Sequence, residues 1–243
     1  MEEKKITLFG VIKSLLLQEP EFQGFVYRKR GNRFSLKFNG GSFYIELGMQ
    51  QWDSVWSLHI WGNISVRYDI CSRWFEKFSV RTLQAQRDTF LLGESFNTAG
   101  LDYSYVVHND KELFDNDYSV FKSALVYLMK NFIPKYSSLT KVYNERVLPI
   151  IKGEKSDFRN LGVEEEFEYL TICRIIAPGN YEILKQKAQD SFRLKYQRKE
   201  LNYMDYHDRI PEIFEYLESL DLEAMMRKKG WTKEEVISLA QFE

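Results

Sequence analysis

The chain is poor in the residues that cross-link small extracellular domains or form linkers. Its 243 residues include 2 Cys, 5 Pro and 13 Gly. Cys71 and Cys173 lie far apart and form no CxxC pair, so no disulfide framework is expected and a reduced, cytoplasmic setting is the simplest one. The low Pro and Gly content excludes collagen-like and proline-rich classes.

The chain also lacks an excess of charge and a long hydrophobic run. Lys and Arg number 34 against 35 Asp and Glu, so no overall field attracts nucleic acid or an anionic membrane. No run approaches the roughly 18 apolar residues that span a bilayer. Thr7, Gly10 and Lys13 interrupt the apolar stretch near the N-terminus. We therefore expect no signal peptide and no membrane partner. The overall charge gives no support for a nucleic-acid partner.

The composition is that of a globular protein. Hydrophobic residues make up 44% and aromatic residues 16%, which is enough apolar surface to exclude intrinsic disorder. At this length the chain forms one large domain or two small ones.

Hydrophobic periodicity predicts an α+β fold with an N-terminal antiparallel sheet. After a helix at 6–17, segments of period two alternate with turn signals at Gly31-Asn32, Asn39-Gly40-Gly41 and Gly62-Asn63. Two-residue connections cannot make parallel crossovers, so residues 22–69 are expected to form an antiparallel meander. The turn at Gly62-Asn63 would separate strands at 55–62 and 64–69. A short helix with Cys71 on its apolar side and closing strands at 89–95 and 101–109 complete the predicted sheet domain, residues 1–112.

From Asp117 onward the period becomes helical. We expect Asp117 to cap the first of these helices and further helices to cover residues 136–151, 163–177, 181–201 and about 209–229. Thr232 would cap a last helix, with Trp231 packed on Val236. Residues 113–243 are therefore predicted to form a helical domain, or a helical extension packed on the sheet.

Metal, nucleotide and thiol chemistry find no support in the motifs. His59, His108 and His207 show no metal-ligand spacing, and Asp205 and Asp208 beside His207 are expected to cap a helix or lie in a solvated loop. The sequence contains neither a GxxxxGK[ST] nor a GxGxxG loop. Both cysteines fall on apolar stripes and are expected in the core. We predict no cofactor.

Hydrolytic chemistry is also unsupported by local spacing. Asp102, Ser104 and His108 share one face of a predicted strand. Four residues of strand span roughly 13 Å, so His108 cannot activate Ser104 and this triad is rejected. An enzyme whose site is assembled from distant residues around His59 or His108 stays open as an alternative. The acidic run at 164–166 begins a helix, where the helix dipole stabilises negative side chains.

The remaining candidate is a surface rather than a reaction centre. On the strand faces opposite the predicted core, arginine is interleaved with tyrosine and tryptophan, a composition typical of binding surfaces. The candidate residues are Arg28, Arg33, Lys37, Tyr44, His59, Trp61 and Arg67. A protein-binding surface, a single-strand nucleic-acid surface, and an outer face that is simply solvated or covered by helices are the three interpretations.

The first 70 residues or so contain a further pattern. Residues 24–34 read GFVYRKRGNRF and residues 43–48 read FYIELG. This hairpin pattern resembles the opening of uncharacterised bacterial domains of unknown function. The resemblance implies a bacterial cytoplasmic protein similar in style to toxin-neutralising immunity proteins, and it brings no catalytic residues. The most economical hypothesis is a non-enzymatic protein-binding module, immunity-like or adaptor.

Overall fold

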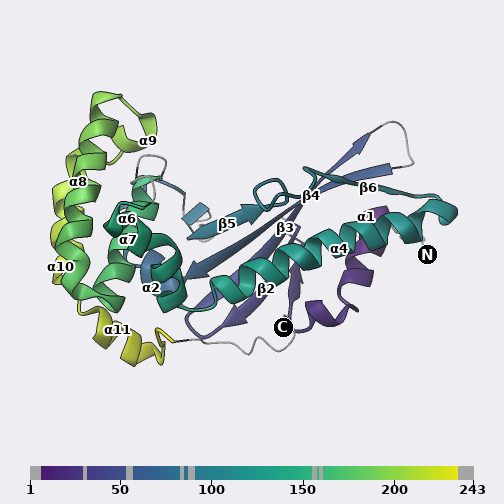
Figure 1. The fold of residues 1–243 in the computed structure, drawn as a ribbon, viewed down its shortest axis with the longest axis horizontal. Coiled ribbons are helices and arrows are strands. Elements are labelled where there is room, and N and C mark those ends of the chain that lie inside the picture. The colour runs from purple at the N-terminus through teal and green to yellow at the C-terminus, as the bar shows by residue number, and fades with distance from the viewer. Residues whose placement is uncertain are drawn as a thin grey trace.

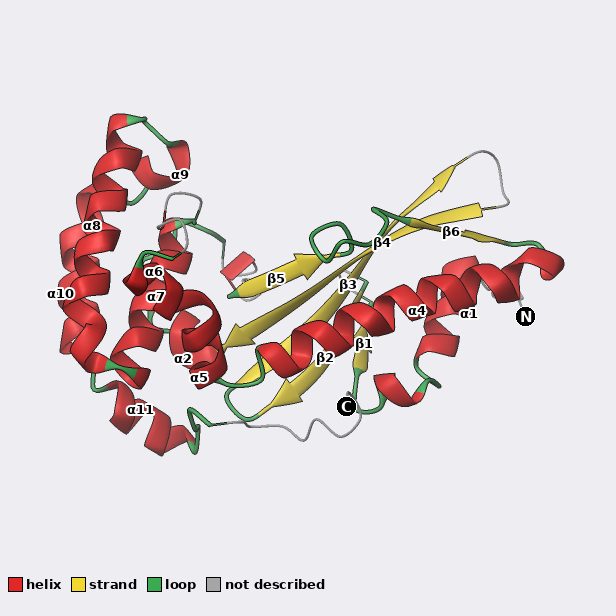
Figure 2. Cartoon of the chain, viewed as in Figure 1, coloured by secondary structure: helices red, strands yellow, loops and turns green. Residues whose placement is uncertain are grey.

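The computed structural model describes residues 7–29, 32–52, 57–82, 85–86, 91–154, 158 and 161–234. It shows the expected α+β architecture, with an antiparallel sheet in the first half of the chain and helices in the second (Figure 1). The helical half gathers beyond one end of the sheet, while one long helix runs along the sheet (Figure 2).

The sheet is an antiparallel meander with one extra strand. Its order is β1-β2-β3-β4-β5, and β6 also pairs with β4. The strands are β1 (Val26–Arg28), β2 (Arg33–Phe38), β3 (Gly41–Trp52), β4 (Ser57–Tyr68), β5 (Leu92–Ser95) and β6 (Tyr105–His108). The turn at Asn39-Gly40 joins β2 to β3 as predicted, and Gly40 has the positive φ of +85° that such turns use. The predicted turn at Gly31-Asn32 lies partly outside the described residues.

The predicted turn at Gly62-Asn63 is wrong, because β4 passes straight through both residues. Gly62 is needed for packing instead. A Cβ on Gly62 would lie 2.6 Å from Cζ of Phe96, so the glycine leaves the space that the buried Phe96 ring occupies. The two expected strands are therefore one twelve-residue strand, β4, which pairs with β3 along its whole length.

Two helices cover one face of the sheet. They are α1 (Leu8–Leu16) and α4 (Lys111–Lys135). The Phe43 ring of β3 meets the Phe132 ring of α4 with centroids 6.3 Å apart. Phe34, Phe43 and Ile60, which lie on this face, are completely buried. The period-two pattern correctly predicted which residues face this core.

The start of α4 differs from the prediction. The helix begins at Lys111, and the Asp110 side chain caps it by accepting from the backbone of Glu112. Asp117 lies inside the helix, where its carboxylate accepts hydrogen bonds from the backbone and ring nitrogens of His108. Asp117, which the sequence predicted to cap the helix, therefore binds β6 instead.

The helical half is more divided than its periodicity predicts. Residues 136–151 form α5 (Leu139–Val142), a π-helical turn and α6 (Leu148–Lys152). Residues 209–229 form two helices, because Leu220 is extended and Asp221 caps a new start. The other α-helices of the described residues are α2 (Asp69–Ser72), α7 (Val163–Ile176), α8 (Tyr181–Gln197), α9 (Leu201–Met204), α10 (Ile210–Ser219) and α11 (Leu222–Lys229). Val236 and most of the predicted last helix lie outside the described residues.

The two halves share one hydrophobic cluster. Buried hydrogen bonds also join the two halves. The Tyr68 hydroxyl donates to the Tyr136 carbonyl at 2.7 Å, and the Trp74 indole donates to the Thr171 hydroxyl at 3.0 Å. Tyr68 ends β4 and Thr171 lies on α7, so the end of the sheet and the helical half are fixed to each other. This junction holds the end of the sheet next to the helical half.

Candidate binding surface

All seven candidate residues lie on one face of the sheet. Directly paired residues of antiparallel strands share a face, and the register joins the candidates across the strands. Arg28 pairs with Arg33, Trp61 with Gly48, and Lys37 with Ser42, which pairs in turn with Arg67. We call Arg28, Arg33, Lys37, Tyr44, His59 and Trp61 the open sheet face, because they lie on the side away from α1 and α4. Arg28 and Lys37 are exposed and the other four are half-buried.

Arg33 and Tyr44 are held by a local network on this face. The Arg33 guanidinium lies 4.8 Å from the centre of the Tyr44 ring and forms an ion pair with Glu46 on β3. The cation–π contact and the ion pair limit the rotamers of both residues. A surface with restrained side chains loses less conformational entropy when it binds a partner.

Trp61 is fixed by the glycine opposite it. A Cβ on Gly48 would lie 1.9 Å from Nε1 of Trp61, so the indole occupies the space that a side chain at position 48 would need. A large aromatic ring in one position on a half-exposed face is a common anchor of protein interfaces.

Arg67 differs from the other candidates because it is buried, with 5% of its surface exposed. It donates to the carbonyl of Gln86 at 2.7 Å and pairs with Asp69 and Glu76 at 3.3 and 3.1 Å. Its charge is thus used inside the protein. The expectation that Arg67 belongs to the exposed contact surface is wrong, and we assign it a structural role.

A hollow of about 810 Å³ opens where the sheet face reaches the helical half. We call it the junction hollow. The Asn39-Gly40 turn forms one wall and the end of α11 forms another, and the Asn39 amide donates to the Gly230 carbonyl at 2.5 Å. The Trp231 ring lies against Gly40. The volume falls within the range of small-ligand and peptide pockets.

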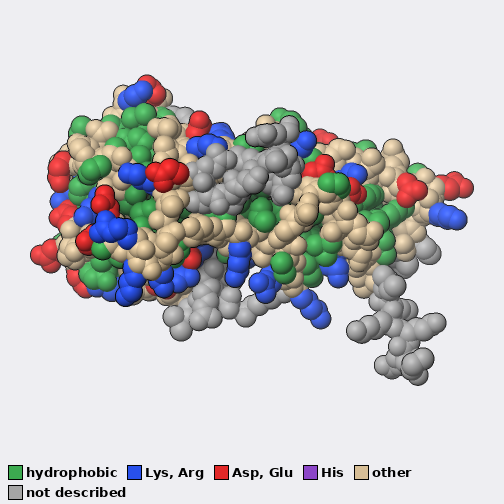
Figure 3. Space-filling model, turned by 90° about the horizontal axis from the view of Figure 1, so that it is seen from below, with side chains coloured by type: hydrophobic (Ala, Val, Ile, Leu, Met, Phe, Trp, Pro, Cys, Tyr) green, Lys and Arg blue, Asp and Glu red, His purple; other side chains and the backbone are tan. Residues whose placement is uncertain are grey.

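Basic side chains are prominent on this side of the molecule. Viewed from below, Lys and Arg side chains stand out along the lower border, from the helical half to the middle (Figure 3). The lining of the junction hollow includes four basic residues, Lys37, Arg67, Arg73 and Lys229, against two acidic ones, Asp69 and Glu76.

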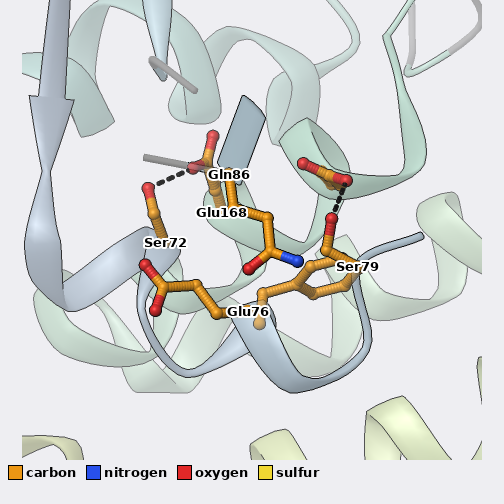
Figure 4. Close-up of a pocket in the computed structure, with 7 residues that line it drawn as sticks. Ser72, Glu76, Ser79, Gln86 and Glu168 are labelled. Atoms are coloured by element: carbon orange, nitrogen blue, oxygen red, sulfur yellow. Dashed lines mark hydrogen bonds between the residues drawn. The ribbon is translucent and has the colours of Figure 1, made fainter. Parts of the chain in front are cut away.

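A small buried cavity adjoins the hollow, between the end of α2 and the first turns of α7. Its volume is about 10 Å³, which is roughly the space of one water molecule. The Ser72 hydroxyl donates to Glu168, and Glu76 and Gln86 also line the space (Figure 4). Burial raises the pKa of Glu168 to about 7. A perturbed carboxyl often marks an active site, but this cavity is too small for a substrate, so the cluster is structural.

His59 and His108 lie away from both cavities. His108 Nδ1 lies 2.7 Å from the Asp117 carboxylate. Burial raises the pKa of Asp117, but the hydrogen bonds from His108 outweigh it and lower the pKa overall. His59 lies on the open sheet face, opposite Val106. Neither residue lines the junction hollow or the buried cavity, and the described part of the chain contains no cluster of potential metal ligands.

The cysteines are core residues, as predicted. Both are buried and free. Burial raises the pKa of both thiols, that of Cys173 to about 12. Since the thiolate is the reactive form, neither cysteine is suited to act as a nucleophile near neutral pH.

The sequence did not reveal Glu168, Lys229 and Trp231 as parts of this region. Glu168 follows the acidic run of α7 and looks like one more solvated residue, yet it is completely buried on the side facing α2. Lys229 is one of three basic residues in the last turn of α11, where such residues commonly balance the helix dipole. No local signal tells which of the three lines a hollow.

Comparisons of the chain with protein-family models, curated proteins and solved structures found no match. The resemblance of residues 24–48 to bacterial domains of unknown function therefore stays a prediction. Among the described residues, no helix combines the length and the hydrophobicity needed to cross a membrane.

Proposed function

We propose that this protein is a non-enzymatic protein-binding module, immunity-like or adaptor in kind, whose contact surface is the open sheet face. The observation that carries the proposal is the fixed position of its large side chains. Trp61 lies over Gly48, and Arg33 lies over Tyr44. Arginine, tyrosine and tryptophan are the residues most enriched at the energetic centres of protein interfaces.

The chemistry of the described residues supports a binding role. The perturbed carboxyl at Glu168 has no space for a substrate, and the ring of His108 is engaged by Asp117 away from the junction hollow. By contrast, the open sheet face combines exposed cations with restrained aromatic rings. Such a face is suited to recognise a partner by shape and contact.

Affinity capture with matched variants tests the proposal. The wild-type chain is compared with Trp61→Ala and Arg28→Glu on the open sheet face. The controls are Leu201→Ala and Arg193→Glu, which change exposed residues of the helical half. Captured proteins are identified by mass spectrometry, and the partner is then purified and titrated.

The expected result is a purified partner whose affinity falls at least tenfold in the two face variants and stays unchanged in the controls. Thermal melting verifies that each variant is folded. Equal affinity of the wild type and both face variants for every purified partner would contradict the proposal.

A further inference from the structure

The junction hollow has an unbalanced positive charge. Arg67 pairs with Asp69 and Glu76, and Arg73 pairs with Asp69 at 2.8 Å. These contacts satisfy both acidic side chains of the lining. Lys37 and Lys229 line the same hollow, and within the part of the chain that the structure describes neither has a carboxylate partner. The hollow thus contains two lysines beside a cluster of two arginines and two acidic residues whose charges balance.

The position of these lysines is fixed by the fold. Lys37 lies at the end of β2, two residues before the turn, and Lys229 is the last residue of α11. The hydrogen bond from Asn39 to the Gly230 carbonyl holds the turn against the end of this helix. The backbone therefore brings two cations from distant parts of the chain to one hollow, where a single anionic segment can meet both.

The hollow is continuous with the open sheet face. Lys37 and Tyr44 belong to both. A partner seated on the open sheet face therefore reaches the hollow without a second, separate contact. The Trp231 ring in its wall provides apolar surface for the methylene groups of a side chain.

We infer that the junction hollow receives an acidic segment of the protein partner, with at least two Asp or Glu side chains directed at Lys37 and Lys229. This inference rests on the proposed function and names the chemistry of the partner. The carboxylates complete the charge balance of the hollow. The attraction is electrostatic and screened by salt, because both lysines are exposed.

A defined peptide tests the charge chemistry without the natural partner. N-acetylated, fluorescently labelled hexaglutamate is titrated with the full chain at about 20 mM and about 300 mM salt, where the screening length differs several-fold. Hexalysine with the same label is the reverse-charge probe. We expect hexaglutamate to bind at low salt and weaken strongly at high salt, and hexalysine not to bind.

Matched double variants locate the site. Lys37→Gln with Lys229→Gln should weaken hexaglutamate binding by roughly three- to tenfold, the range expected for two exposed ion pairs. Lys29→Gln with Lys228→Gln is the control. Both control residues are exposed. Lys29 directly follows β1 and Lys228 precedes Lys229 on α11, and neither lines the hollow. The control variant should bind like the wild type.

Three results would overturn the inference: no hexaglutamate binding at low salt, equal binding by the two double variants, or tighter binding of a uridine hexanucleotide with the same dependence on Lys37 and Lys229. The last result would make the hollow a nucleic-acid site. The proposed function is tested independently: it fails when substitution of Trp61 and of Arg28 leaves the affinity of the purified partner unchanged. A partner that needs these residues but not the two lysines would leave the function standing and remove the acidic segment.

Discussion

The Ser72 hydroxyl donates a hydrogen bond of 2.5 Å to Oε1 of Glu168, between residues 96 positions apart. Ser72 ends α2, directly after the sheet, and Glu168 lies on α7. Both are buried. The bond fixes the sheet against the helical half, and the pKa of Glu168 follows from its position: burial, the largest effect, raises it to about 7.

Glu168 should make stability fall with rising pH. In the unfolded chain the carboxyl ionises near its ordinary pKa of 4.5, whereas in the folded chain it holds its proton up to about pH 7. The folded state therefore binds more protons between these values, and the free energy of unfolding decreases across this window. The contribution is fully present below about pH 4.5 and is lost by about pH 7.

The variant Glu168→Gln removes this titration and keeps an acceptor for Ser72. In urea unfolding from pH 5 to pH 8, the free energy of unfolding of the variant should rise relative to that of the wild type, by at most about 3 kcal/mol. Glu154→Gln, at an exposed position, is the control and should run parallel to the wild type. A constant difference between Glu168→Gln and the wild type would show that Glu168 titrates normally.

The buried ion pair of Glu166 and Lys195 leads to a second prediction. The Glu166 and Lys195 side chains are 0% and 4% exposed, and burial raises the pKa of Glu166 although the neighbouring Lys195 opposes this shift. Lys195→Met should destabilise the fold by about 3–5 kcal/mol, because it leaves a buried carboxyl without its cation. The loss of stability should be larger at pH 9, where Glu166 is ionised, than at pH 6, where Glu166 holds a proton and carries no charge.

Chemical denaturation of two further variants verifies this account. Lys152→Met breaks an exposed pair with Glu154 and should change stability by less than about 1 kcal/mol. Lys195→Met combined with Glu166→Gln should recover part of the loss. If the double variant were as unstable as Lys195→Met, the loss would come from packing rather than from the unpaired charge.

Gly62 gives a prediction about packing. Gly62→Ala places a methyl group 2.6 Å from the Phe96 ring inside the core, and this overpacking should destabilise the fold by about 1–3 kcal/mol. Gly179→Ala is the matched control, since a Cβ there meets no atom within 4 Å. Its effect should stay within about 0.5 kcal/mol. Thermal unfolding of both variants distinguishes a steric effect from a general effect of replacing glycine.

Arg67 gives a prediction about its structural role. Lysine offers one ammonium group where Arg67 reaches Gln86, Asp69 and Glu76 with three different nitrogens. Arg67→Lys should therefore cost about 2–4 kcal/mol, whereas Arg193→Lys on an exposed helix face should cost almost nothing. A stable Arg67→Lys variant in urea unfolding would show that the arginine serves contact rather than structure.

The period-two pattern was sufficient to predict much of the sheet. It placed Phe34, Phe43 and Ile60 on the core face and Arg33, Tyr44 and Trp61 on the other, because side chains alternate along a strand wherever one face is buried. It was not sufficient at Gly62, where the glycine that marks a turn in sequence is required by the Phe96 ring. The helix-cap prediction also failed at Asp117, whose carboxylate binds His108 rather than a helix end.

The sequence by itself determined the class of fold, the antiparallel meander and the polar character of the open sheet face, since all three depend on neighbours a few residues away. The tertiary structure alone decided that Arg67 is buried, that Glu168 holds a proton near neutral pH, and that Lys37 and Lys229 line one hollow. Burial and charge balance at these positions come from residues that lie far apart in the sequence, such as Ser72 and Glu168, which are 96 positions apart. No local periodicity carries that information.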